Sequence, residues 1–312
     1  MRAVHRRNLR CDYITTEFSS TEVDKPLAGT YYSGVVKQGI NLPAIKPSDS
    51  KKDKRDSEMD RLKDQVLIVT GGAHGIGLAY CEGLAAEGAR VVVADIDGQG
   101  AEAVVASLGE AGHDALAVAT DVSQPDSTDT MARLTMERFG RIDGLINNAA
   151  IYQRPAVTRG PFEEIPVEEW DRLMGVNLRG VFLCCRAVVP HMKEQGSGKI
   201  VNISSGTVFN GSTQMLHYVT SKAGVIGLTR SLARELGDYN INVNAIAPGL
   251  TVSMDDDDED KLLRFENRMQ ARSLKRLESP QDLVGAVLFL CSTDSDFMTG
   301  QTMVVDGGAQ MH

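Results

Sequence analysis

Tyr218 and Lys222 stand four residues apart in a segment whose apolar spacing predicts a helix. Positions i and i+4 of a helix lie on one face, so the phenol and the ammonium can point into the same space. A free tyrosine has a pKa of about 10, and a fixed ammonium nearby favours the phenolate and lowers that pKa. The pair therefore predicts a tunable general base, although the Tyr-x-x-x-Lys spacing alone also arises by chance on helix surfaces.

Length and composition indicate one large domain, or one domain with an extension. The chain has 312 residues, of which 42% are hydrophobic and 24% are charged. No apolar run approaches the roughly 18 residues that a membrane span requires, so we expect no membrane association. Its five cysteines show no metal-ligand spacing, which predicts free thiols in a cytoplasmic protein and no metal site.

Charge is divided unevenly along the chain. The first 58 residues hold 11 Lys and Arg against 8 Asp and Glu, which leaves a net charge of -12 for the remainder of a chain whose total is -9. An acidic main domain repels the phosphate backbone, so we expect no nucleic-acid partner.

Residues 1–58 show neither strand nor helix periodicity and end in a polar run, so we predict a disordered extension before a single domain at 59–312. Two alternatives concern this extension. Four arginines in the first eleven residues faintly resemble an organelle transit peptide, and translation from Met59 would remove the extension altogether.

From residue 61 onward, short apolar runs alternate with longer amphipathic stretches. Apolar runs without polar alternation indicate strands that are covered on both faces, as in a parallel sheet. The pattern predicts an α/β fold with a doubly wound, Rossmann-type parallel sheet and helices on both faces. The expected strands are 66–70, 91–95, 115–120, 145–149, 199–204, 241–247 and 303–305, and the expected helices are 76–87, 98–111, 124–139, 167–194, 215–237 and 280–291.

A glycine-rich segment, Gly71 to Gly77, follows the first expected strand and opens the first expected helix. Its spacing places Gly75, Ile76 and Gly77 at the helix start and departs from the common G-x-G-x-x-G dinucleotide pattern. Positions without side chains let a pyrophosphate approach the backbone, and the helix N-terminus offers unpaired N–H groups. An ordinary glycine-rich turn is the alternative.

Asp95 ends the second expected strand. A carboxylate there would accept hydrogen bonds from an adenosine ribose and repel a 2′-phosphate, which predicts NAD rather than NADP. Asp121 and Val122 end the third expected strand and are similarly placed to contact the adenine edge, although a simple turn explains Asp121 nearly as well.

As a set, these motifs resemble the compact, single-domain branch of the short-chain dehydrogenase/reductase family over roughly residues 61–310. The residues that carry the resemblance are Thr70-Gly71-Gly72-Ala73-His74-Gly75-Ile76-Gly77, Asn147-Asn148-Ala149-Ala150, Asn177, Ser205, Tyr218, Lys222 and Pro248-Gly249.

The resemblance implies a role for each matched residue. Tyr218 would exchange a proton with the substrate oxygen, and Lys222 would lower its pKa and bind the nicotinamide ribose. Ser205 would hold the substrate oxygen, with Ser204 as the neighbouring alternative. Asn177 would break regular helix bonding and hold a water that connects Lys222 to solvent. Asn148 and Thr251 would line the nicotinamide side.

The resemblance also implies a homodimer or homotetramer built on the helices expected at 167–194 and 215–237, whose apolar residues include Val181-Phe182-Leu183 and Val225-Ile226. Burial of these residues within the domain is the alternative.

A mobile lid is expected after Gly249, and it contains six successive acids at 255–260. They would either attract a cationic substrate or form a solvated loop, and we favour the loop.

The function we expect is NAD-dependent hydride transfer involving a secondary alcohol or ketone of medium size, because residues in 151–161, 207–216 and 250–265 give a mostly apolar pocket. One alternative is a catalytically idle NAD-binding sensor or scaffold on the same fold. Another is an epimerase or dehydratase, which would usually carry a larger C-terminal region. The presence of Ser205, Tyr218 and Lys222 together favours the dehydrogenase.

Overall fold

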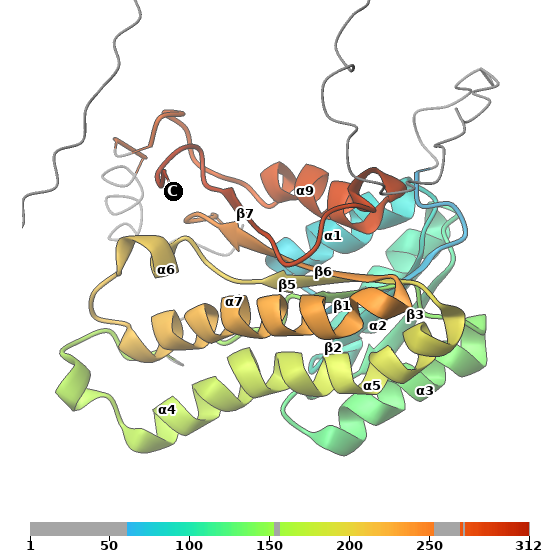
Figure 1. The fold of residues 1–312 in the computed structure, drawn as a ribbon, viewed down its shortest axis with the longest axis horizontal. Helices are drawn as coiled ribbons and strands as arrows, with labels where there is room; N and C mark the ends of the chain where they lie inside the picture. The colour runs from blue at the N-terminus through green and yellow to red at the C-terminus, as the bar shows by residue number, and fades with distance from the viewer. Residues whose placement is uncertain (1–60, 153–156, 253–268, 271, 312) are drawn as a thin grey trace, which may run out of the picture. The chain divides into compact units, whose positions relative to one another are not determined.

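The computed structural model describes residues 61–152, 157–252, 269–270 and 272–311 (Figure 1). The extension expected at 1–58 and the acidic run at 255–260 lie outside the described residues.

Seven parallel strands form one sheet in the order β3-β2-β1-β4-β5-β6-β7. The chain winds outward from β1 to β3, then returns to the other side of β1 and continues from β4 to β7. The crevice expected at such a reversal lies at the carboxyl ends of β1 and β4, where open α/β sheets bind ligands. The strands are β1 (Val66–Thr70), β2 (Arg90–Asp95), β3 (Ala115–Ala119), β4 (Gly144–Asn147), β5 (Gly198–Ile203), β6 (Ile241–Pro248) and β7 (Thr302–Val305).

Helices cover both faces of the sheet (Figure 1). One face carries α1 (Gly75–Ala86), α2 (Gly98–Glu110) and α9 (Gln281–Cys291). The other carries α3 (Pro125–Phe139), α5 (Gly180–Gln195) and α7 (Leu216–Leu236). The remaining helical segments are α4 (Val167–Met174), α6 (Thr207–Asn210), the π-helical turn η2 (Gly175–Arg179) and the 3₁₀ turns η1 (Phe162–Glu164), η3 (Gly237–Tyr239) and η4 (Thr293–Ser295).

The apolar strands supply two separate cores. In β1, Leu67 and Val69 pack with α1, α2 and α9, whereas Val66 and Ile68 pack with α3, α5 and α7. Successive strand side chains point to opposite faces, so a strand buried on both sides must be apolar at every position. The fold class predicted from the sequence is therefore confirmed.

The structure differs from the expected elements in two places near the crevice. The helix expected at 167–194 is interrupted by the wide turn η2, which lies between α4 and α5. Strand β4 ends at Asn147 instead of Ala149, because the backbone amides of Asn148 and Ala149 turn to the Thr70 hydroxyl, at 3.1 Å each. The chain thus leaves the sheet directly beside the end of β1.

Some apolar residues expected on a partner surface lie inside the domain. Val181, Leu183 and Val225 are buried in the core beneath α5 and α7, whereas Phe182 is 50% exposed. Among the described residues, the helical stretch 167–195 is long and apolar enough to span a bilayer, but half of its most apolar window is buried within the domain.

Candidate active site

The glycine-rich loop after β1 is shaped by two close approaches. Gly71 has φ +65°, and a Cβ there would lie 2.8 Å from the Ala149 Cα atom. A Cβ on Gly77 would overlap the Gly71 carbonyl and approach the Asn148 amide. These positions require glycine because any side chain would collide with backbone. Helix α1 then begins at Gly75, also at positive φ, with Ile76 in its first turn.

The N-terminus of α1 is open to an anion. It has no side-chain hydrogen-bond cap, and its first turn contains no acidic residue. The first N–H groups of a helix have no partner within the helix, and the helix dipole favours negative charge there. The loop and this terminus therefore fit a pyrophosphate.

Asn148 supports this loop from the end of β4. Its side-chain amide donates to the carbonyls of Thr70 at 3.1 Å and Gly71 at 2.9 Å. The sequence placed this residue on the nicotinamide side, whereas its described hydrogen bonds hold the glycine-rich loop in position. Contact with a cofactor stays a prediction.

Asp95 lies buried at the end of β2, with 8% of its surface exposed. One carboxylate oxygen accepts from the Ala73 amide and the other from the Asp97 amide, both at 3.0 Å. A carboxylate has about four lone-pair sites, so each oxygen can still accept another hydrogen bond. Ile96 beside it is 75% exposed and offers no cation for a phosphate.

Asp121 forms the turn that the sequence offered as an alternative. Its carboxylate accepts from the Ser123 amide at 2.9 Å and the Ser123 hydroxyl at 2.7 Å. Val122 is buried and packs against Gly180 at the start of α5. Both residues follow β3 at the sheet's carboxyl edge, and neither has a described contact that assigns it to adenine.

Helix α7 presents Tyr218 and Lys222 to the end of β5. The Ser205 hydroxyl lies near the Tyr218 phenol and acts to lower its pKa. The Lys222 ammonium donates to the Ile203 carbonyl at 2.8 Å and lies 5.9 Å from the centre of the Tyr218 ring. All three side chains are at least 93% buried, so the structure brings the predicted set together in a desolvated place.

Burial dominates the electrostatics of this pair. It raises the pKa of Tyr218, and it lowers the pKa of Lys222 from 10.5 to about 8. Each direction follows because a buried site disfavours the charged form of either group. The neighbouring Ser205 hydroxyl acts to lower the Tyr218 pKa, but by less than burial raises it. The lowering by Lys222 that the sequence suggested is not among the effects on the pKa of this phenol, which are burial and Tyr152, both raising it, and Ser205 and Arg159, both lowering it.

The two neighbouring serines have different environments. Ser204 donates its hydroxyl hydrogen to the Lys222 carbonyl at 2.8 Å and so ties β5 to α7. The Ser205 oxygen accepts from the Thr207 hydroxyl at 2.9 Å and contacts Tyr218. Of the two, Ser205 is the one beside the phenol.

Asn177 lies fully buried within the π-helical turn η2. Its carboxamide accepts from the Ile151 amide at 2.7 Å and donates to the Ile151 carbonyl at 3.1 Å. It also approaches the Ser221 hydroxyl at 3.4 Å, next to Lys222. The break in regular helix bonding is thus present, and the water that this residue would hold stays a prediction.

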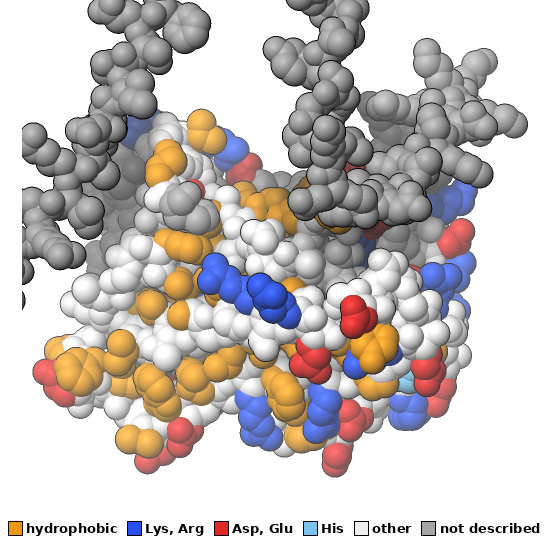
Figure 2. All heavy atoms as spheres, viewed as in Figure 1, with side chains coloured by type: hydrophobic (Ala, Val, Ile, Leu, Met, Phe, Trp, Pro, Cys, Tyr) orange, Lys and Arg blue, Asp and Glu red, His pale blue; other side chains and the backbone are white. Residues whose placement is uncertain are grey.

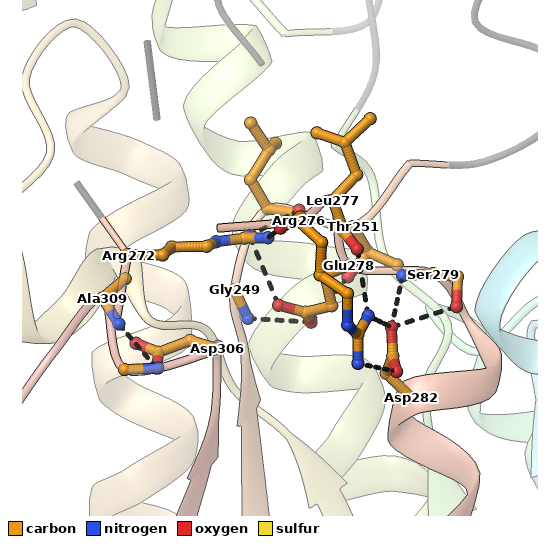
Figure 3. A network of polar contacts seen from close by, with 12 residues as sticks. Gly249, Thr251, Arg272, Arg276, Leu277, Glu278, Ser279, Asp282, Asp306 and Ala309 are labelled. Atoms are coloured by element: carbon orange, nitrogen blue, oxygen red, sulfur yellow. Dashed lines mark hydrogen bonds and ion pairs between the residues drawn. The ribbon is translucent and has the colours of Figure 1, made fainter. Parts of the chain in front are cut away.

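Thr251 belongs to a polar network after β6 that sequence reasoning missed (Figure 3). Its hydroxyl donates to the Glu278 carboxylate at 3.0 Å, and the Gly249 amide contacts the same oxygen at 3.2 Å. The Arg272 guanidinium lies 3.3 Å from the other Glu278 oxygen and donates to the Leu250 carbonyl at 2.7 Å. This buried ion pair fixes the chain that leaves β6.

A second group of missed residues lies on the other side of Tyr218. The Tyr152 ring centre is 5.0 Å from that of Tyr218, and the Arg159 guanidinium is 5.4 Å from the Tyr152 ring centre. Glu169 of α4 and His217 of α7 share a 2.8 Å hydrogen bond below this loop. Their separation in sequence carries no spacing signal that could have predicted them.

Taken together, the crevice fits a nicotinamide dinucleotide. The glycine-rich loop and α1 suit its pyrophosphate, Asp95 suits a ribose diol, and Lys222 and Tyr218 lie beyond β4 where the nicotinamide half would extend.

Comparison with known proteins agrees with this arrangement. A family model described as enoyl-(acyl carrier protein) reductase matches residues 71–310. A probable galactose dehydrogenase of Rhizobium meliloti is 41% identical over 260 residues, which cover 81% of this chain and 97% of that protein. A levodione reductase of Leifsonia aquatica is 38% identical over 261 residues, which cover 81% of this chain and 96% of that protein.

A solved structure shows the same fold at similar identity. The 3-ketoacyl-(acyl-carrier-protein) reductase of Brucella melitensis, complexed with NADH, has a TM-score of 0.73 and 34% identity, covering 80% of this chain and all of that chain. The protein therefore belongs to the short-chain dehydrogenase/reductase family, oxidoreductases that act on alcohol or ketone substrates.

Proposed function

We propose that the protein is an NAD-dependent oxidoreductase acting on a secondary alcohol or its ketone, with Tyr218 as the acid/base. The observation that carries this proposal is the grouping of Tyr218, Ser205 and the Lys222 ammonium in a buried place at the end of β5. When bound, the nicotinamide supplies or accepts the hydride. The protein's own residues supply the proton and hold the oxygen.

Each catalytic side chain has a task that its position allows. Tyr218 takes the proton from a substrate alcohol or returns it to a ketone oxygen. Ser205 donates a hydrogen bond to the same oxygen, so two donors stabilise the charge that develops there. Proton transfer by a positioned group contributes about 10²–10⁴-fold. Lys222 holds a positive charge near the phenol, and Asn177 positions the loop after β4.

The choice of NAD over NADP is argued from Asp95. Its carboxylate is fixed by two backbone amides at the end of β2 and keeps lone pairs for a ribose diol. A 2′-phosphate would meet this negative charge with no cation at position 96 to offset it. The Brucella relative was solved with NADH, which agrees with this preference.

Substrate identity is left open by the relatives. Their names refer to galactose, levodione and a 3-oxoacyl-[acyl-carrier-protein], which are chemically distinct. An idle NAD-binding scaffold is the competing function, and the close grouping of Ser205, Tyr218 and Lys222 argues against it.

We further propose a homodimer or homotetramer formed through the face of α4, η2, α5 and α7. Figure 2 shows hydrophobic side chains gathered along α4 and α5. A shallow hollow on this face is lined by Asp171, Met174, Gly175, Leu178, Arg179, Phe182 and Leu228. Exposed apolar surface of this kind marks partner surfaces.

The four described cysteines are buried and free, as expected in the reducing cytoplasm that we propose.

The decisive experiment is the Tyr218→Phe variant, measured by NAD reduction with a panel of secondary alcohols. We expect turnover to fall by at least about 100-fold, since the proton acceptor is lost, while binding of NAD changes little. Tyr239→Phe is the matched control, because Tyr239 is 42% exposed on η3, away from the crevice. Retained turnover in Tyr218→Phe would remove this phenol from the mechanism.

A further inference from the structure

The guanidinium of Arg159 contacts the ring of Tyr152, which in turn contacts the ring of Tyr218. Its guanidinium carbon lies 5.4 Å from the Tyr152 ring centre, and the Tyr152 ring lies 5.0 Å from the Tyr218 ring. One guanidinium nitrogen also reaches the sulfur of Met215 at 4.0 Å. Met215 is buried and directly precedes α7. The cation therefore borders the space in front of Tyr218.

This cation has no acidic partner in the described part of the chain. An acid close by, Glu169, is fully engaged: its oxygens accept from the Thr158 amide and hydroxyl, each at 2.6 Å, and from the buried His217 ring at 2.8 Å. Glu169 is only 10% exposed and His217 is not exposed at all. No described Asp or Glu forms an ion pair with Arg159.

The same contacts hold the Arg159 backbone in place. Because Glu169 binds both the amide and the hydroxyl of Thr158, the residue before Arg159 is anchored to α4, and through His217 to α7. A binding group works best when neighbouring contacts fix its position. The loop thus presents Arg159 from a buried, hydrogen-bonded base.

A partly buried guanidinium without an anionic partner among the described residues has lost part of its solvation with little compensation from them. Its planar array of N–H donors matches a carboxylate, with which it can form two parallel hydrogen bonds. Its described contacts, with the Tyr152 ring and the Met215 sulfur, leave several of its five N–H donors for such bonds. The positive charge of Arg159 also acts to lower the pKa of Tyr218, against the larger rise that burial causes.

We propose that Arg159 binds a carboxylate carried by the substrate, so that the substrates are hydroxy acids and the corresponding oxo acids. The proposal rests on the proposed function, because it assumes that the reacting oxygen is held by Tyr218 and Ser205. The two contacts in series keep the guanidinium carbon within about 10 Å of the Tyr218 ring centre, a separation that a hydroxy acid can span when it is hydrogen-bonded at both ends.

The experiment compares acids with their neutral esters. Turnover is measured for 3-hydroxybutanoate, 4-hydroxypentanoate and mandelate, and for the methyl ester of each, with wild type, Arg159→Gln and Arg159→Lys. Arg133→Gln is the matched control, because it removes one positive charge from an exposed site on α3. Calorimetric binding of the oxo acids to the NAD-loaded variants gives a readout that does not depend on turnover.

In Arg159→Gln we expect kcat/KM for the preferred acid to fall about 10- to 100-fold, as for loss of a hydrogen bond to a charged group. The ester should change by less than about threefold, which also shows that the variant is folded. Arg159→Lys should lie between, since it keeps the charge but not the planar fork. Binding of the oxo acid should weaken in parallel, and Arg133→Gln should match wild type.

The result that overturns the proposal is an equal loss for acid and ester in Arg159→Gln, or a wild type that turns over neutral alcohols but no acid. Either outcome leaves the proposed oxidoreductase function intact, because activity on neutral alcohols would still require Tyr218. If no alcohol gives turnover that Tyr218→Phe abolishes, the proposed function fails and this inference fails with it.

Discussion

The Lys222 ammonium donates its hydrogen bond to the Ile203 carbonyl at 2.8 Å, while its nitrogen lies 5.9 Å from the Tyr218 ring centre. Lys222 thus ties α7 to the end of β5. In this position the ammonium is buried, and burial lowers the pKa of Lys222 to about 8.

A pH-dependent contribution to folding stability follows from this lowered pKa. Above pH 8 the folded protein releases the Lys222 proton, whereas the unfolded chain keeps it until its pKa of 10.5. The unfolded state then binds more protons, so stability rises with pH in this window. Relative to Lys222→Met, wild type should gain about 1 kcal/mol between pH 8 and 9, measured by urea unfolding. A constant difference between the two proteins would contradict the lowered pKa.

Cofactor preference is tested by Asp95→Asn, which removes the charge but keeps the size of the side chain. We expect the ratio of kcat/KM for NADP to that for NAD to rise by about 10-fold or more, because repulsion of the 2′-phosphate disappears. Since Asp95 also binds two backbone amides, the melting temperature should fall modestly. Exposed Asp126→Asn on α3 serves as the charge control. An unchanged ratio would show that another feature selects the cofactor.

The buried ion pair between Arg272 and Glu278 predicts a large penalty for removing one partner. Both side chains are at most 5% exposed, so Arg272→Ala leaves a carboxylate buried without its cation and should cost about 3–5 kcal/mol. The nearby pair Arg276 and Asp282 offers a control, because Arg276 is 60% exposed and Arg276→Ala should cost less than about 1 kcal/mol. Similar losses in the two variants, measured by chemical unfolding, would contradict the role of burial.

The proposed subunit interface is tested at Phe182, an apolar side chain on the surface of α5. Phe182→Asp should shift the protein toward smaller species in light scattering, because a charge buried in an interface is unfavourable. Phe297→Asp, at a fully exposed site after η4, is the control and should leave the size unchanged. A wild type that is already monomeric would refute the proposed assembly.

Much of the fold was predictable because its signal is local. The run Val66–Thr70 is apolar at every position, which occurs where both faces are covered, and the structure places β1 at those bounds. The wide turn at Asn177 was predicted only through family resemblance, since a helix that contains a π turn keeps helical apolar spacing on both sides of it.

Prediction of the site was uneven for a physical reason. The placement of Tyr218 beside Lys222 follows from helix geometry. The glycine-rich loop was predictable because positions without a side chain allow another group to approach the backbone closely. The partners Glu169 and His217 come from different helices, so only tertiary packing brings them together. The balance between burial and charge at Tyr218 was likewise invisible, because it depends on how completely the side chain is desolvated.

The wide turn η2 has one further consequence for the chain. A π turn closes its hydrogen bonds over one more residue than an α turn, so the segment 175–179 absorbs an extra residue while Val181 and Leu183 keep their places in the core. A one-residue deletion here would restore regular helix without rotating α5 relative to α4, and its main effect would be to move Asn177 away from Ile151. The length of this segment therefore serves the position of one carboxamide and not the packing of the helix.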